Sequence, residues 1–126
     1  GFDKFPGTSN GLKYDYYLVD GKKEGQYRTY HDNGQLWIVT NYINDKLNGP
    51  HLTYLRSGNL FCEHTYIDGK IEGKFITYHF NGKVSQISHY QNDIQVGLTE
   101  IYDSNGKFIK HEKRIVSDWS QSYYKL

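Results

Sequence analysis

Apolar stretches and turn-forming clusters alternate along this chain with a period of 24 residues. Each period holds two stretches of about seven residues rich in Tyr, Ile, Leu, Val and Phe, a length that suits strands. Between them lie short clusters of Gly, Asn, Asp and Ser, which would interrupt a helix repeatedly but are typical of turns. The pattern predicts an all-β fold made of repeated hairpins.

Equivalent positions of the repeat form columns, and three of these columns contain one residue type throughout. They are Gly25, Gly49, Gly73 and Gly97; Tyr30, Tyr54, Tyr78 and Tyr102; and Gly34, Gly58, Gly82 and Gly106. A fourth column holds Leu18, Tyr42, Tyr66 and Tyr90, and a fifth, apolar one holds Leu36, Leu60, Val84 and Phe108. We therefore expect an elongated single-sheet meander of four 24-residue units with atypical terminal caps.

The columns divide the chain into units at 18–41, 42–65, 66–89 and 90–113. Residues 1–17 resemble a degenerate half-unit that supplies the first edge strand, and residues 114–126 form a C-terminal cap or tail. All of these segments, 1–126, are expected to belong to one domain, because the chain is too short for two ordinary cores.

Turn chemistry predicts which residues lie opposite each other. A two-residue loop at Asn33-Gly34 would set Tyr30 opposite Trp37, whereas a three-residue loop with a left-handed Gly34 sets Tyr30 opposite Leu36. We favour the second register, because it pairs the Tyr and aliphatic columns on one face. Tyr42 follows Leu36 at an even offset, so it is predicted on that same packed face.

The other face is predicted to carry Tyr27, Trp37, Val39, Leu55, Phe61 and Phe75. Two roles compete for this surface, since large exposed apolar patches are rare. Either Tyr27, Trp37, Phe61 and Phe75 bind a partner, or the C-terminal tail covers them with Trp119, Tyr123, Tyr124 and Leu126.

In the longer turns, the column Gly21, Asp45, Gly69 and Asp93 contains residue types that tolerate positive φ.

Composition and charge narrow the function. Aromatic residues make up 17% of the chain, with 13 Tyr, while 15 Lys and Arg nearly balance 14 Asp and Glu. This balance argues against nucleic acid as a partner. The single Cys62 excludes an intramolecular disulfide, and we see neither a signal peptide nor an apolar run of membrane-spanning length. A cytoplasmic location is expected.

The sequence gives little support for a catalytic or metal-binding site. Cys62 and His64, two residues apart on a strand, lie about 7 Å from each other, too far for direct proton transfer. His31 and His79 share a column two units apart, about 19 Å at four strand spacings, so one ion cannot bridge them. Turn chemistry explains the recurrent aspartates. We expect no catalytic residue, no metal and no cofactor.

The unit Y-x-D-G-K-x-x-G-x-x-x-x-Y-x-x-N-G-x-L resembles the MORN repeat variant of YwqK-like proteins. The match covers residues 17 to about 114 and depends on Gly25, Tyr30, Asn33, Gly34 and Tyr42. The second and fourth units depart from it in turns, with Asp45, Asp93 and Ile94. The resemblance implies a scaffold of β-hairpins for other proteins, and some YwqK-like proteins are annotated antitoxins.

These observations together predict a non-enzymatic scaffold that binds another protein. Masking of a toxin is an alternative within the same class. Binding to anionic lipid is a further alternative, because Lys22, Lys23, Lys46, Lys70 and Lys83 recur near turns. Self-association through the edge strands is also open, since unpaired strand edges can pair with a second copy.

Overall fold

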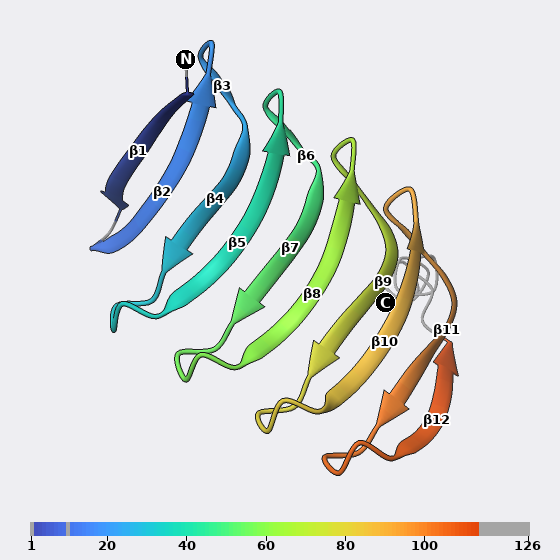
Figure 1. Ribbon diagram of the computed structural model, residues 1–126. Coiled ribbons are helices and arrows are strands. Elements are labelled where there is room, and N and C mark those ends of the chain that lie inside the picture. The colour runs from blue at the N-terminus through green and yellow to red at the C-terminus, as the bar shows by residue number, and fades with distance from the viewer. Residues whose placement is uncertain (1, 10, 114–126) are drawn as a thin grey trace, which may run out of the picture.

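The protein is one open antiparallel β-sheet in the computed structural model, which describes residues 2–9 and 11–113. The strands are β1 (Phe2–Ser9), β2 (Leu12–Val19), β3 (Lys22–Lys23), β4 (Gly25–Tyr30), β5 (Leu36–Ile43), β6 (Lys46–Leu47), β7 (Gly49–Tyr54), β8 (Leu60–Ile67), β9 (Lys70–Tyr78), β10 (Val84–Gln91), β11 (Ile94–Tyr102) and β12 (Phe108–Lys113). Figure 1 shows the hairpins following one another side by side across the sheet.

The strand order is that of a meander. It runs β1-β2-β4-β5-β7-β8-β9-β10-β11-β12, while the short β3 and β6 pair with β2 and β5. Every neighbour in this order is also the next long strand in the chain, and β1 forms one edge of the sheet. The prediction of an all-β, single-sheet hairpin meander is confirmed. The predicted unit starts, such as Tyr42, fall inside strands, and the unit boundaries themselves stay a prediction.

The short loops have the predicted register. Tyr30 pairs with Leu36, and the equivalent pairs are Tyr54 with Leu60, Tyr78 with Val84, and Tyr102 with Phe108. Gly34 has a φ of 86°, and its amide donates to the carbonyl of His31 at 2.9 Å. This is the three-residue loop with a left-handed glycine, and the choice between the two registers is confirmed.

The longer turns are tight two-residue turns in which both central residues have positive φ, as a type I′ turn requires. Asn44 and Asp45 have φ values of 53° and 70°, and Asp68 and Gly69 have 53° and 83°. The column of Asp45 and Gly69 therefore does demand positive φ. Asp45 compensates for its strain with a hydrogen bond, because its carboxylate accepts the Lys23 amide at 2.7 Å.

A β-bulge beside each short loop changes which side chains share a face. Thr29 pairs with Ile38 although Tyr30 pairs with Leu36, so Trp37 is an extra residue without a partner across the ladder. Phe61, Ser85 and Ile109 are the equivalent extra residues. One extra residue reverses the alternation of side chains in the rest of the strand.

The bulge makes the predicted assignment of faces wrong in two places. Tyr42 lies opposite Gly25 and contacts the ring of Tyr27, so it is not on the face of Tyr30 and Leu36. Val39 pairs with Arg28 and lies with Tyr30, not with Tyr27. We call the side bearing Tyr27 and Tyr42 the aromatic face, and the side bearing Tyr30 and Val39 the opposite face.

The sheet has no conventional core among the described residues. Val39, 6% exposed, is the one buried apolar side chain there, so the predicted packed face does not exist as such. Instead, side chains on both faces cover one another partially along the sheet. The tail proposed to cover the aromatic face, with Trp119, Tyr123, Tyr124 and Leu126, lies outside the described residues.

Side-chain ladders fasten each hairpin to the next at both ends of the strands. At the type I′ turns, a side-chain oxygen accepts an amide of the following turn: Glu24 from Asn44 at 2.6 Å, Asn48 from Asp68 at 2.9 Å, and Glu72 from Asn92 at 2.6 Å. At the short loops, an asparagine amide donates to the next loop: Asn33 to the Arg56 carbonyl, Asn59 to Phe80 and Asn81 to Ser104. These bonds fix the lateral spacing of the units.

Candidate functional site

A row of stacked rings crosses the N-terminal half of the aromatic face. Tyr16 of β2 lies between Phe5 and Tyr27, with ring centroids 5.5 and 5.1 Å away and nearly parallel planes. Tyr27 in turn contacts Tyr42 at 6.0 Å. The rings stack because neighbouring strands are separated by about 4.8 Å, close to the spacing of stacked aromatic rings. The Lys23 ammonium lies 5.4 Å from the Tyr27 ring centroid and adds a cation–π contact.

A second run of ring contacts, which includes two imidazoles, lies on the same face in the middle of the sheet, and we call the two runs together the ring row. His64 is stacked between His51 at 4.8 Å and Phe75 at 4.4 Å, and Tyr66 meets its edge. Phe75 then contacts Tyr90 at 5.8 Å. Beyond Tyr90 the face becomes polar, since Thr99, which is fully buried, hydrogen bonds to Ser88 at 2.9 Å.

The position of His64 makes it a neutral residue. Only 9% of it is exposed, and neither ring nitrogen has a hydrogen-bond partner among the described residues. Burial, with a smaller contribution from the neighbouring His51, lowers the pKa of His64 to about 4. Burial also lowers the pKa of His51. This pair therefore behaves as part of the apolar ring row at neutral pH.

Trp37 and Phe61 lie at the short-loop end of the aromatic face. They line a cavity of about 520 Å³ together with Thr53, whose pairing with Ile38 places it on that face. Phe80, on the third short loop, completes the ring lining. We call this hollow the aromatic cavity. Trp37 and Phe61 project there because the bulge removes them from the hydrogen-bonded ladder.

The four predicted partner-surface residues thus fall into two groups on the aromatic face. Tyr27 and Phe75 belong to the ring row, two units apart, whereas Trp37 and Phe61 line the aromatic cavity. Tyr42, Tyr66 and Tyr90 join the ring row as well, contrary to the predicted faces. Sequence reasoning missed Phe80, although an apolar residue inside a turn was a visible signal.

Two of the four units match the MORN repeat variant. The family model matches residues 23–44 and 71–92, which are two repeat periods apart. The first segment contains the hairpin β4–β5, and the second contains the hairpin β9–β10 except for its first residue, Lys70. MORN repeats are associated with protein and membrane interaction and are not known for enzymatic activity. No curated protein matches the chain.

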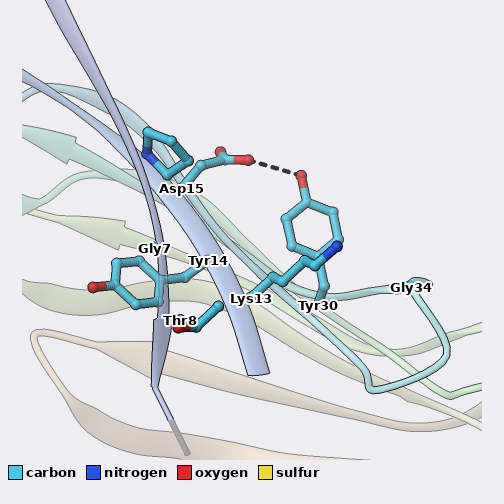
Figure 2. A pocket seen from close by; sticks show the side chains of 8 residues that line it. Gly7, Thr8, Lys13, Tyr14, Asp15, Tyr30 and Gly34 are labelled. Carbon is cyan, nitrogen blue, oxygen red and sulfur yellow. Dashed lines mark hydrogen bonds between the residues drawn. The ribbon is translucent and has the colours of Figure 1, made fainter. Parts of the chain in front are cut away.

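A second cavity lies at the start of this MORN-like sheet, on the opposite face. It measures about 670 Å³ and is lined by residues of β1, β2, β4 and the first short loop, including Pro6, Lys13, Asp15 and Tyr30. Figure 2 shows the Asp15 carboxylate reaching the Tyr30 hydroxyl, which donates to it at 3.0 Å. The Arg28 Nε donates to the same carboxylate at 2.9 Å. The charge of Asp15, which is 9% exposed, is therefore balanced by groups within the protein.

The remaining polar candidates have structural partners. The Nε2 atoms of His31 and His79 pair with the carbonyls of Tyr54 and Tyr102 at 2.8 and 3.0 Å. Burial raises the pKa of the Cys62 thiol, which keeps it protonated and a poor nucleophile. Within residues 2–9 and 11–113, no group of three His, Cys, Asp or Glu side chains is placed to hold a metal ion. That part of the chain also has no helix able to span a bilayer.

Proposed function

We propose that this protein is a non-enzymatic scaffold whose aromatic face binds a partner protein. The observation that supports the proposal is the number of rings on this face, over which the described residues place no second layer. Two runs of ring contacts, from Phe5 to Tyr42 and from His51 to Tyr90, lie beside Trp37 and Phe61 at the short-loop end. Aromatic rings are the commonest energetic anchors of protein interfaces, because they bury much area at a small cost in side-chain entropy.

The rigidity of the sheet favours this use. Both ladders of side-chain hydrogen bonds hold neighbouring hairpins at a fixed spacing, so the rings are arranged before a partner arrives. A surface that is ordered in advance loses little conformational entropy on binding. The association of MORN repeats with protein interaction supports the same conclusion.

The test is an affinity capture from the lysate of the native host, with wild-type protein and with the double variant Trp37→Ala, Phe61→Ala. The matched control is Leu36→Ala, Leu60→Ala, since these residues precede Trp37 and Phe61 but pair with the tyrosines of the opposite face. One protein captured by the wild type and the control, and lost with the double variant, is the expected result. Identical captures by all three proteins would contradict the proposal.

The partner's identity decides the biological role. A toxin captured in this way would make the protein an antitoxin that masks it, and a second copy of the chain would make it a self-assembling component. Light scattering across a dilution series distinguishes the second case. In each of these roles the same rigid ring surface supplies the binding energy.

Anionic membranes are a second candidate partner, supported by the type I′ end of the sheet. There Ile43 and Ile67, each 57% exposed, pair with Lys46 and Lys70 on the opposite face. Exposed aliphatic side chains beside lysines favour an anionic lipid surface. Salt-sensitive binding to phosphatidylserine vesicles is the expected result for this role, and vesicle binding that Lys46→Glu, Lys70→Glu leaves unchanged would contradict it.

A further inference from the structure

The aromatic cavity brings together rings from three different hairpins, and His31 and Tyr54 line it as well. Trp37 comes from β5, Phe61 from β8, and Phe80 from the loop between β9 and β10. Phe80 is 81% exposed and Phe61 40% exposed, so much of this ring surface faces solvent in the described structure. Such exposure is costly for a side chain that has no partner to meet.

The repeat itself does not require these rings. The bulge column reads Trp37, Phe61, Ser85 and Ile109, and the loop column of Phe80 reads Asp32, Arg56, Phe80 and Ser104. Polar residues thus satisfy the same backbone positions in other units. The rings converge once among the described hairpins, across the first three short loops, and local turn chemistry does not explain them.

The cavity is held in shape by bonds between the loops. The His31 ring stacks on Trp37 at 5.2 Å, and its Nε2 pairs with the Tyr54 carbonyl at 2.8 Å. The Asn59 amide donates to the Phe80 carbonyl at 2.8 Å. The first three loops are therefore fixed relative to one another, and a ligand does not have to order them.

The lining chemistry selects an uncharged, apolar ligand. Three polar side chains around the rings already have partners: His31 with Tyr54, Arg56 with Asp32 at 2.6 Å, and Ser57 with the Asn59 amide at 3.4 Å. The Arg56–Asp32 pair leaves no net charge at the rim. The lining beside the rings is mainly apolar, so a charged group placed against them would lose hydration.

We propose that the aromatic cavity accepts one aromatic side chain, Phe, Tyr or Trp, from the partner polypeptide. The inference rests on the proposed scaffold function and names the anchor by which the partner is recognised. An aromatic ring fits because it meets Trp37, Phe61 and Phe80 in stacked or edge-to-face arrangements, which add to the gain from burying apolar area.

The test uses Trp37 as its own reporter. The chain has two Trp residues, so Trp119→Phe leaves Trp37 as the one tryptophan. This variant is labelled with 5-fluorotryptophan and titrated with N-acetylphenylalaninamide, with N-acetylleucinamide and N-acetylalaninamide as comparisons. We expect a saturable ¹⁹F shift with the phenylalanine probe, at least about fivefold weaker with the leucine probe, and none with the alanine probe.

Phe80→Ser introduces the residue found at the equivalent position of the fourth unit, Ser104. It should lower the affinity for the phenylalanine probe at least about fivefold. It should leave the thermal midpoint nearly unchanged, since Phe80 is 81% exposed. The matched control is Ile94→Ser, which removes another exposed apolar side chain, 63% exposed, at the type I′ end of the sheet. This control should bind the probe like the parent protein.

Three outcomes would overturn the inference: no saturable shift, equal binding of the leucine and phenylalanine probes, or unchanged affinity in Phe80→Ser. Affinity capture separates this failure from failure of the scaffold function. A partner captured equally by wild type and Phe80→Ser would leave the scaffold in place and remove the cavity as its anchor site. Absence of any captured partner would count against the scaffold itself.

Discussion

Strand β9 shows how differently the two faces of the sheet are built. On the aromatic face, Phe75 lies between His64 and Tyr90, with ring centroids 4.4 and 5.8 Å away. On the opposite face, Ile76 and Tyr78 of the same strand pair with Ile87 and Val84. One face is thus a row of ring contacts, and the other is a mixture of aliphatic pairs and polar bonds.

The opposite face also places a carboxylate beside several of its tyrosines. The Tyr30 hydroxyl donates to Asp15 at 3.0 Å, and the Tyr102 hydroxyl donates to Glu100 at 3.3 Å. The comparison teaches that a one-layer sheet without a covered core depends on contacts along both surfaces. Each face supplies mostly half-buried side chains, with a few buried ones such as Val39 and His64, so neither face is dispensable for stability.

Removing one ring from each face of β9 gives the largest expected effect. Phe75→Ala and Tyr78→Ala should each lower the free energy of unfolding by about 3 kcal/mol, because each change deletes a large side chain packed between strands. Urea unfolding followed by circular dichroism measures both. An unchanged urea midpoint for Tyr78→Ala would show that Tyr78 on the opposite face does not stabilise the fold. The conclusion that both faces stabilise the sheet would then be wrong.

Protonation of His64 is expected to weaken the aromatic face selectively. The pKa of His64 is lowered from 6.5 to about 4 in the folded protein, so the unfolded chain binds more protons between these values. Stability is fully present above pH 6.5 and is lost as the pH falls to 4, by an amount on the order of 3 kcal/mol.

The control for this titration keeps the ring but removes the proton site. His64→Phe should flatten the pH dependence of the unfolding free energy, leaving the smaller part due to His51, whose pKa burial also lowers. A slope in His64→Phe equal to that of the wild type would refute the assignment.

The ion pair of the opposite face offers a smaller, two-step test. Asp15→Ala leaves the Arg28 guanidinium partly buried without its carboxylate and should cost about 2 kcal/mol. The double variant Asp15→Val, Arg28→Leu reproduces the Val39–Leu52 pair two strands along and should lie within about 1 kcal/mol of the wild type. A double variant less stable than Asp15→Ala would mean that this end of the sheet specifically needs the charges.

The smallest expected change in stability is at Gly34, in the short loop next to the bulge that changes which side chains share a face. Gly34 has a φ of 86°, and no atom lies within 4 Å of the position that a Cβ would take. Gly34→Ala should therefore cost only backbone strain, about 1 kcal/mol. Gln35→Ala, next to it, is the control for removing a side chain in the same loop. Equal stability of Gly34→Ala and the wild type would argue against the left-handed conformation.

Much of the fold could be predicted from the sequence. The recurring glycines gave the hairpin meander, and Gly34 with its three-residue loop gave the pairing of Tyr30 with Leu36. These features are local, because a left-handed residue at a fixed position selects one type of loop and hence one register. The positive φ of Asp45 was predictable on the same ground.

Less of the candidate site could be predicted from the sequence, because the bulge does not change the length of the repeat. The extra residue at Trp37 occurs in every unit, so the period stays at 24 and the bulge leaves no trace as an insertion. It nevertheless moved Tyr42 to the aromatic face and Val39 to the opposite face. His64 was likewise judged by its distance from Cys62, while its stacking on Phe75 depends on a strand further along the chain.

By itself, therefore, the sequence determined the elements, their order and their turns, since these depend on backbone preferences within a few residues. Only the tertiary structure decided which columns share a face and which side chains meet across hairpins. The aromatic cavity is the clearest case, because Trp37, Phe61 and Phe80 come together only when three loops are stacked laterally. That stacking is set by hydrogen bonds such as Asn59 to Phe80, between residues more than twenty positions apart.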